Sequence, residues 1–344
     1  MHLFKVPPQL ATACQMASPT VLELSPDEGS FTVNSVLIGD EERGYILVDT
    51  GLPETWTQLD HQLRGFLVHN KLRGVVLTHL HPDHCGAAAQ LLRECAAWLA
   101  YHENENLTRM YPSLLLDSAP HWLPAPVLDA VRGFADAMKT TPYPSKYLVG
   151  GTILHEDADG PWLALHTPGH TPGHICIYNP ETSTLVSGDH LLPNETSNIP
   201  FYPLQGYNPL RLYLESLAKV MRMGPKQTIP AHGKIFTNVQ ERIVDIFVHH
   251  RRRLREAAVA VDSGESSIQS IAAEITWSRG RFLELKPLDQ WLAILETLSH
   301  LEFLTSVGYI KRVAGETPRY ILGEGDWGLV EKTIDLIMRK SNEI

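Results

Sequence analysis

The 344-residue chain is poor in cysteine and contains no long apolar run. Its four cysteines stand far apart, at Cys14, Cys85, Cys95 and Cys176, with no CxxC pair. This spacing argues against a disulfide framework and against a zinc site built on cysteine. No window approaches the ~20 apolar residues of a membrane span, and the N-terminus lacks a long apolar core behind a basic start. We expect reduced thiols, no membrane association and a cytoplasmic location.

An excess of basic residues is also missing, because 29 Lys and Arg stand against 39 Asp and Glu, for a net charge of −10. Residues 1–240 carry 15 of the basic and 23 of the acidic residues. The composition therefore does not favour a broad basic surface that binds nucleic acid. With 43% hydrophobic residues and no low-complexity segment, the chain can bury a sizeable core, which excludes disorder.

Strand-like and helical segments alternate in the first part of the chain. Strands are expected at residues 31–38, 44–48, 74–78, 162–166, 175–178, 184–187 and 227–230, and helices at 56–67, 86–95 and 210–223. This alternation predicts an α/β architecture. Residues 103–150 interrupt the rhythm with prolines, aromatic residues and two helical patterns, and we interpret them as an insertion.

The pattern becomes mainly helical after Val239. Helices are expected at residues 239–261, 266–277, 288–307 and about 326–340, with a hairpin at 309–313 and 319–322. We therefore divide the chain into a domain of residues 1–240 and a small domain of residues 241–344. In the basic segment 249–255, His250 and Leu254 should face the core and the arginines mainly the solvent.

The sequence His79-Leu80-His81-Pro82-Asp83-His84 directly follows the expected strand at 74–78. In extended backbone His79 and His81 point the same way. Pro82 then bends the chain, so that Asp83 and His84 lie at the start of the next helix. Imidazole and carboxylate together suit zinc, iron or manganese. The segment therefore predicts a metal site.

Four residues cannot complete a site for two metals, and further candidates lie downstream. His170 stands in TPGHTPGH, where proline and glycine on both sides favour a tight turn. Asp189 lies in SGDH and His232 in PAHG, each just after an expected strand. Each signal is weak alone, but together with residues 79–84 they predict a dinuclear metal centre.

In this order after LVDTG, the segments HLHPDH, TPGHTPGH, SGDH and PAHG resemble the motifs of metallo-β-lactamase-fold hydrolases, over about residues 15–240. The resemblance implies a four-layer αβ/βα sandwich with metals at one edge, between two sheets. It implies one metal held by His79, His81 and His170, a second held by Asp83, His84 and His232, and Asp189 bridging both.

The resemblance implies supporting residues as well. Asp49 of LVDTG matches a position that supports the ligands without binding metal. His174 lies close to a ligand position in the sequence, so we expect it to support the ligands by hydrogen bonding or simply to pack there. Tyr202 and Tyr207 lie in a loop where related lactonases and thioesterases place substrate contacts. Residues 241–344 resemble the winged-helix tail of the β-lactamase-like-protein-2 group, which includes endoribonucleases and fungal polyketide thioesterases. Such a tail is expected to serve homodimer formation or to shape the substrate pocket.

The leading expectation is a hydrolase with two divalent ions, zinc before iron or manganese, that cleaves an ester, thioester or lactone through a metal-bridging hydroxide. Asp83 would orient the hydroxide. The substrate is expected to be a small molecule with an apolar portion, because the aromatic insertion could line the cleft. The alternatives are a phosphodiesterase or ribonuclease, an iron-dependent oxidoreductase, and a binding protein that has lost catalysis.

Overall fold

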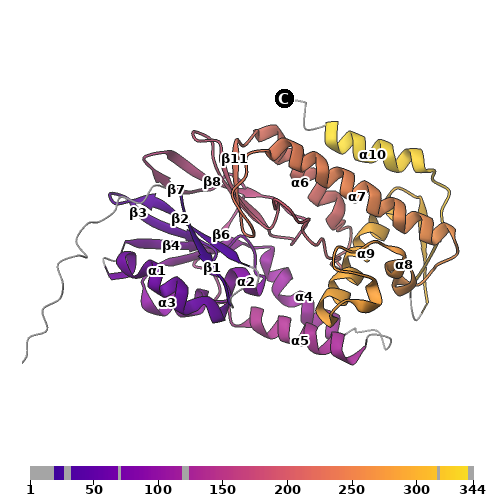
Figure 1. Ribbon diagram of the computed structural model, residues 1–344, viewed down its shortest axis with the longest axis horizontal. Helices are drawn as coiled ribbons and strands as arrows, with labels where there is room; N and C mark the ends of the chain where they lie inside the picture. Colours follow the sequence, from indigo (N-terminus) through magenta and orange to yellow (C-terminus); the bar gives the residue numbers. More distant parts are fainter. Residues whose placement is uncertain (1–18, 27–31, 69–70, 118–123, 316–317, 340–344) are drawn as a thin grey trace, which may run out of the picture.

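Two β-sheets lie face to face with helices on their outer sides in the computed structural model (Figure 1). The structure describes residues 19–26, 32–68, 71–117, 124–315 and 318–339. Cys14 lies outside these ranges, and the other three cysteines are free thiols. Within the described ranges, every helix is too short or too polar to span a lipid bilayer.

The first sheet has six strands in sequential order: β1 (Thr20–Leu24), β2 (Val33–Asp40), β3 (Gly44–Val48), β4 (Leu72–Val76), β5 (Trp98–His102) and β6 (Lys146–Leu148). Strands β1 to β3 are antiparallel, and β3 to β6 run parallel. The second sheet has the order β11 (Gln227–Pro230), β10 (Thr184–Gly188), β9 (Ile175–Asn179), β8 (Gly160–His166) and β7 (Ile153–Asp157). Only β10 and β11 pair in parallel there.

Three apolar clusters define the four layers. Ile46 of β3 and Ile177 of β9 belong to the cluster between the sheets. The next residue of β3, Leu47, packs instead with Leu59 of α1 on the outer face of the first sheet. Leu185 of β10 packs with the helices beyond the second sheet. Because side chains alternate along a strand, each sheet is covered on both faces, and the predicted αβ/βα sandwich is confirmed.

The first helical layer contains α1 (Trp56–Val68) and α3 (Ala88–Glu94), preceded by the short helices η1 (Pro53–Thr55) and α2 (Pro82–Cys85). The segment interpreted as an insertion forms α4 (Glu105–Asp117) and α5 (Ala125–Lys139). Its last residues form β6, which pairs with β5 and was not predicted. The helix expected at 86–95 is also shorter, because α2 ends at Cys85 and α3 begins only at Ala88.

The outer layer of the second sheet contains α6 (Pro209–Met223) and α7 (Val239–Asp262). Asn208 caps α6 by accepting from the backbone N–H of Arg211, and Gly224 ends the helix in the left-handed conformation. The chain continues through α8 (Ile268–Glu274), η2 (Phe282–Glu284), α9 (Pro287–Ser306), β12 (Ile310–Val313), β13 (Arg319–Leu322) and α10 (Trp327–Arg339). A helical C-terminal region with one hairpin is thus present.

Residues on both sides of position 240 share one apolar cluster. Leu217 of α6 and Phe247 of α7 belong to it, together with Phe303 of α9 and Ile334 of α10. The C-terminal region therefore packs directly against the helices that cover the second sheet. The division at residue 240 and the winged-helix likeness stay predictions.

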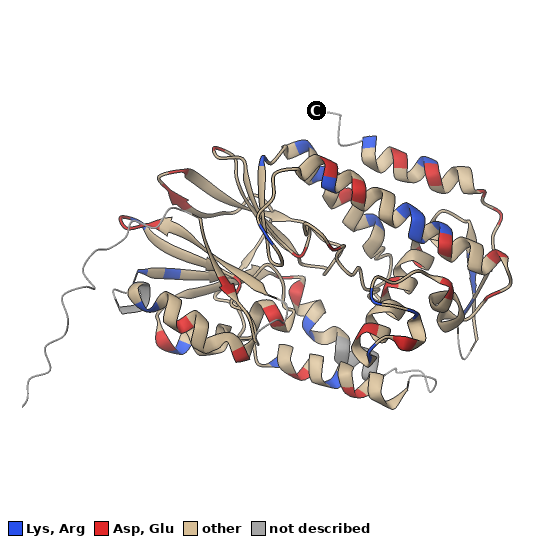
Figure 2. Ribbon diagram, viewed as in Figure 1, with Lys and Arg blue, Asp and Glu red and all other residues tan. Residues whose placement is uncertain are grey.

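The basic segment of α7 is largely engaged within the chain. His250 and Leu254 are buried, as predicted. Arg251 pairs with Glu331 and Asp335 of α10, at 3.2 and 2.7 Å. Figure 2 accordingly shows basic and acidic residues interspersed along α7 and α10.

One arginine departs from the expected outward orientation. Arg253 is only 5% exposed, and its guanidinium lies 4.4 Å from the ring centroid of Trp277. The periodicity of α7 alone did not reveal that the segment after α8 covers this face.

Candidate metal centre

The candidate ligands lie just beyond the carboxyl ends of three strands and in one turn. His79 and His81 follow β4, and Asp189 and His232 follow β10 and β11. His170 lies in the turn between β8 and β9. Because these ends meet at one edge of the sandwich, residues far apart in the chain come together there.

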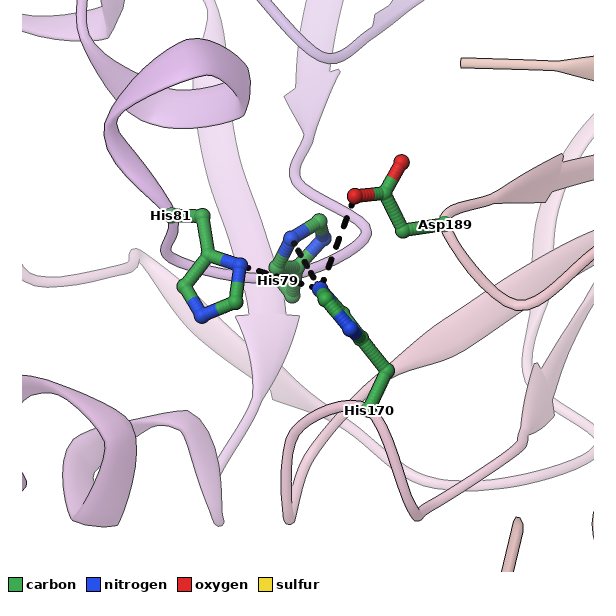
Figure 3. A group of neighbouring side chains, drawn as sticks. All are labelled: His79, His81, His170 and Asp189. Carbon is green, nitrogen blue, oxygen red and sulfur yellow. Dashed lines mark hydrogen bonds and ion pairs between the residues drawn. The ribbon is translucent and has the colours of Figure 1, made fainter. Parts of the chain in front are cut away.

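The first group of side chains consists of His79, His81, His170 and Asp189 (Figure 3). The Nε2 atom of His170 lies 3.2 Å from Nε2 of His79 and 2.9 Å from Nδ1 of His81. Zinc–nitrogen bonds of about 2.0–2.1 Å in a tetrahedron place ligand nitrogens about 3.3 Å apart. The spacing of the three imidazoles therefore fits one metal ion.

The second group consists of Asp83, His84 and His232. Oδ2 of Asp83 lies 3.4 Å from Nε2 of His232 and 3.7 Å from Nε2 of His84. Asp83 and His84 belong to α2, whose first residue is Pro82, so the short helix presents both side chains toward the end of β11.

Asp189 faces both groups. Its Oδ2 atom lies 3.5 Å from Nε2 of His170, whereas its Oδ1 atom lies 3.3 Å from Nε2 of His232 and 3.5 Å from Nε2 of His84. A carboxylate with one oxygen toward each group has the arrangement needed to bridge two ions. The structure thus places all seven predicted ligands in the two predicted groups, and their roles as ligands stay predictions.

Two buried polar atoms of the centre have no hydrogen-bond partner in the described structure. They are Nε2 of His84 and Oδ1 of Asp189, which face each other. Burying such atoms without a partner is costly. A cation between them would satisfy both, so the donor set fits a divalent metal.

The outward-facing ring nitrogens are held by hydrogen bonds. Nδ1 of His170 donates to the carbonyl of Asn198 over 2.7 Å, and Nδ1 of His232 donates to the carbonyl of Thr32 over 2.8 Å. Nδ1 of His84 donates to Oδ2 of Asp49 over 2.8 Å. Because Nδ1 of each ring is held by an acceptor, Nε2 faces the centre, where a metal ion can take the place of a proton.

Asp49 lies where the resemblance expects a supporting residue. Its carboxylate accepts hydrogen bonds from the backbone N–H and the hydroxyl of Thr78, both over 2.7 Å, besides the one from His84. Its φ is +60°, which few residues other than glycine adopt. The chain therefore keeps a strained turn after β3 that aims this carboxylate at the ligand segment.

His174 contacts the backbone of Asp189. Its Nε2 accepts from the Asp189 N–H over 3.2 Å, so its Nδ1 carries the proton and donates to the hydroxyl of Thr167 over 2.9 Å. His174 is fully buried, and burial lowers its pKa well below the usual value. This placement agrees with the predicted supporting role, which stays a prediction.

The two groups differ in their electrostatics. Burial lowers the pKa of His79 well below its usual value and that of His81 to about 3, so these rings stay neutral. Burial also acts on His232, but Asp189 and Asp83 outweigh it and raise the pKa to about 9. The second group is therefore a place where the carboxylates favour positive charge.

The predicted substrate residues lie among other aromatic side chains. Tyr202 is buried, with ring centroids 4.4 Å from Tyr111 and 5.9 Å from Tyr207. The hydroxyl of Tyr207 is buried and has no hydrogen-bond partner in the described structure. Whether either tyrosine contacts substrate stays a prediction.

The predicted insertion reaches the ligands. Phe134 of α5 lies with its ring centroid 5.3 Å from that of His81 and 5.6 Å from that of Trp291 in α9. An aromatic wall built from α5 and α9 therefore stands beside the first group.

Cys85, which directly follows a candidate ligand, is fully buried. Burial raises the pKa of its thiol to about 12. It is therefore a neutral packing residue at neutral pH, at the last position of α2.

Among the residues that contact the ligand segments, sequence reasoning missed Glu105 and Asn198. Glu105 accepts hydrogen bonds from both segments that carry the first group. The carbonyl of Asn198 orients His170. A backbone carbonyl leaves no signal in a sequence, and Glu105 stands alone at the start of a segment interpreted as an insertion.

Comparisons with known proteins agree with this geometry. The metallo-beta-lactamase superfamily matches residues 29–232. The chain is 26% identical over 258 residues to the atrochrysone carboxyl ACP thioesterase nsrC of Aspergillus novofumigatus. This match covers 72% of this chain and 64% of that protein. It is 25% identical over 260 residues to an atrochrysone carboxyl ACP thioesterase of Emericella nidulans, covering 74% and 68%. The chain thus spans about two thirds of the length of these relatives.

Two solved structures are similar over most of the chain. A beta-lactamase domain protein from Burkholderia ambifaria has a TM-score of 0.75 and 29% identity, covering 90% of this chain and 93% of that one. A metallo-beta-lactamase family protein from Thermus thermophilus has a TM-score of 0.71 at 24% identity, covering 88% and 98%, which shows the fold alone. With most of the first 240 residues matched by the family and the ligand segments in place, the chain belongs to the metallo-beta-lactamase superfamily.

Proposed function

We propose that this protein is a metal-dependent hydrolase that cleaves a thioester. The observation that carries the proposal is the position of Asp189, with one carboxylate oxygen toward each of two ligand groups. The thioester is favoured over an oxygen ester or a lactone because the relatives described above are named as acyl-carrier-protein thioesterases.

The seven candidate ligands would hold two metal ions. His79, His81 and His170 would hold one ion, and Asp83, His84 and His232 the other, with Asp189 shared. Two divalent ions bound there, zinc before iron or manganese, would supply hydroxide at neutral pH and polarise the thioester carbonyl. Orientation of the attacking water and binding of the acyl group would be the work of other side chains and of Asp83.

Asp83 would orient the attacking water. Burial raises the pKa of Asp83, but His84 and His232 outweigh burial and lower it to about 2. The carboxylate therefore stays charged and can accept a hydrogen bond from the water, which fixes the direction of attack.

The acyl group would pack against Phe134, which is partly buried beside His81 and is backed by the buried Trp291. The free hydroxyl of Tyr207 could donate to a polar atom of the substrate. Tyr202 would then support Tyr207 by packing rather than through its own hydroxyl. This arrangement suits a small-molecule acyl group with an apolar portion.

The four arginines of residues 251–255 give no support to a nucleic-acid substrate. All four contact acidic or aromatic side chains of this chain, as described for Arg251 and Arg253 and as shown by Arg255, 4.6 Å from the ring centroid of Trp327. We therefore do not propose phosphodiesterase activity, but the experiment below includes a phosphodiester substrate.

The test combines elemental analysis with three assays, on an acyl thioester of N-acetylcysteamine, a lactone and bis-p-nitrophenyl phosphate. Wild type should hold about two ions per chain and cleave the thioester fastest. Asp189→Ala should lose metal and at least ~100-fold in rate, whereas His61→Ala, an exposed histidine of α1, should match wild type. Thioester cleavage that persists after complete metal removal, or cleavage of the phosphodiester alone, would contradict the proposal.

A further inference from the structure

Glu105 is the first residue of α4 and is fully buried. Its Oε2 atom accepts a hydrogen bond from the backbone N–H of Leu80 over 2.8 Å. Its Oε1 atom accepts from the backbone N–H of Gly173 over 2.9 Å and from the hydroxyl of Thr171 over 2.5 Å. One buried carboxylate thus receives three hydrogen bonds.

The donors come from the two segments that carry the first ligand group. Leu80 stands between His79 and His81 after β4, in the first sheet. Thr171 directly follows His170, in the turn that joins two strands of the second sheet. Glu105 therefore connects the opposite sheets of the sandwich at the point where the three imidazoles meet.

A backbone hydrogen bond also joins the same segments, from the N–H of Ile175 to the carbonyl of Thr78 over 3.0 Å. It lies where β4 ends and β9 begins, on the strand side of the imidazoles. The carboxylate of Glu105 is bonded next to the ligands themselves, so it limits how far the two segments can separate there.

Gly173 approaches Glu105 closely. A Cβ atom on Gly173 would lie 2.6 Å from the backbone nitrogen of Glu105 and 2.9 Å from its Oε1. Such distances are shorter than van der Waals contact, so position 173 must be glycine for the carboxylate to approach. This close approach is a second observation, besides the hydrogen bonds, that the start of α4 packs tightly against the segment that carries His170.

We propose that Glu105 is a positioning residue that fixes the spacing of His79, His81 and His170. This inference rests on the proposed function, in which these three imidazoles hold a metal ion. Within the described structure, the hydrogen bonds of the Glu105 carboxylate come from the two segments that carry the first group, so its effect should fall on the first metal ion. Removal of a buried group that accepts three hydrogen bonds leaves its donors without partners, which is costly and makes the loss of this connection measurable.

The first experiment is metal titration of Glu105→Ala and Glu105→Gln. The control is Asp157→Asn, which changes another buried carboxylate, one that accepts from the Trp162 indole in the second sheet. The dissociation constant of one of the two ions should rise ~10–100-fold in Glu105→Ala. The visible spectrum of the cobalt-substituted protein should show that the ion with three imidazole ligands is the one lost. Glu105→Gln should lie between Glu105→Ala and wild type, because its amide oxygen still accepts from one segment.

The control should keep wild-type affinity for both ions. Two ions bound with unchanged affinity in both Glu105 variants would overturn the inference, as would equal weakening of both ions. If Glu105→Ala does not fold, Thr171→Val removes one of the three hydrogen bonds and keeps the shape of the side chain. In Thr171→Val the dissociation constant of the first metal ion should rise by a smaller factor. If this dissociation constant were unchanged in both Thr171→Val and Glu105→Gln, the inference would be overturned.

A second experiment needs no metal. In the metal-free protein, the amides of Leu80 and Gly173 should exchange with deuterium at least ~10-fold faster in Glu105→Ala than in wild type, while amides of β7 and β8 stay unchanged. Equal exchange in the two proteins would overturn the positioning role. If wild type binds no metal, the proposed function fails, and this exchange measurement still decides whether Glu105 connects the segments.

Discussion

The side-chain amide of Asn198 donates a hydrogen bond to the carboxylate of Glu296 over 2.9 Å, and its backbone carbonyl accepts one from Nδ1 of His170 over 2.7 Å. Glu296 belongs to α9, and α9 makes two further bonds to this loop. The carbonyl of Leu292 accepts from the same amide over 3.2 Å, and the N–H of Phe201 donates to the carbonyl of Leu295 over 3.1 Å. The C-terminal region thus holds the loop that orients a candidate metal ligand.

Replacement of Glu296 by alanine should therefore affect both stability and the metal centre. The partly buried side chain of Asn198 would lose the carboxylate of Glu296 as a hydrogen-bond partner, which should lower the free energy of unfolding by about 1–3 kcal/mol. Metal affinity should fall by up to ~10-fold, because His170 is less well oriented. Urea denaturation of the metal-free protein and metal titration measure the two effects. Glu274→Ala, at an exposed glutamate of α8, is the control, and equal behaviour of the two variants would contradict the prediction.

Asp49 should be the most sensitive of the supporting residues. Alanine there removes three hydrogen bonds, from the N–H and hydroxyl of Thr78 and from His84, and leaves their donors buried. We expect a loss of about 2–4 kcal/mol in the free energy of unfolding. The ion of the second group should bind ~10–100-fold more weakly, because His84 loses its orienting partner.

The matched control for Asp49 is Asp60→Ala. Asp60 forms a surface ion pair with Arg64 one helical turn away, at 2.5 Å, and such pairs contribute little. Its removal should change the free energy of unfolding by no more than ~0.5 kcal/mol. A loss of similar size in the two variants, measured by urea denaturation, would show that Asp49 has no special role.

The elements with strong local signals could be predicted from the sequence. Residues 44–48 and 227–230 are strands with the predicted bounds, because β-branched residues there are flanked by glycine and proline. The ligand segment 79–84 was also recognisable, since a short stretch with three histidines and an aspartate has few other uses. Parallel strand ends then bring the downstream ligands to the same edge.

Features that depend on distant parts of the chain could not be predicted. Residues 98–102 form β5 without a clear turn signal before them, and β6 has only three residues, so neither stood out. Glu105 acquires its role from donors 25 to 68 positions away. Arg253 is buried by Trp277, a contact that the periodicity of a single helix does not contain.

Removal of metal should destabilise the protein. A ligand that binds only the folded state, at 100 times its dissociation constant, stabilises it by about 2.7 kcal/mol. Excess EDTA should therefore lower the melting temperature of the metal-loaded protein. In Asp189→Asn the same treatment should have a much smaller effect, because the shared carboxylate is missing. A melting temperature that is insensitive to EDTA in loaded wild type would contradict metal binding by the folded state.

Acid should destabilise the protein through His300. This side chain is buried, and burial lowers its pKa from 6.5 to about 3, with Arg253 and His249 acting in the same direction and the bond from its Nδ1 to the Glu296 carbonyl opposing. Between these two pH values the unfolded chain binds a proton that the folded chain does not. Stability therefore falls as the pH falls below 6.5, by about 2 kcal/mol at pH 5 for this one group.

The variant His300→Gln isolates this contribution. Its loss of stability between pH 7 and pH 5 should be smaller than that of wild type by about 2 kcal/mol, because glutamine does not titrate. Other buried histidines, including His250, keep part of the pH dependence. His61→Gln, at an exposed position, should follow wild type. Urea denaturation at the two pH values measures the difference, and parallel curves for wild type and His300→Gln would refute the assignment.

Gly169 should tolerate no side chain, because it shapes the turn that presents His170. Its φ is +142°, and a Cβ atom would lie 2.5 Å from Cα and 2.8 Å from N of Tyr213 in α6. Gly169→Ala therefore has to displace the turn from α6, which should lower the free energy of unfolding by about 2–4 kcal/mol and weaken metal binding.

Gly133 is the control within the same chain, since it lies inside α5 and a Cβ atom there would meet nothing within 4 Å. Gly133→Ala should stabilise the protein by about 0.5–1 kcal/mol and leave metal affinity unchanged. If both alanine variants had wild-type stability and metal affinity, the backbone conformation of the turn would not be what positions His170.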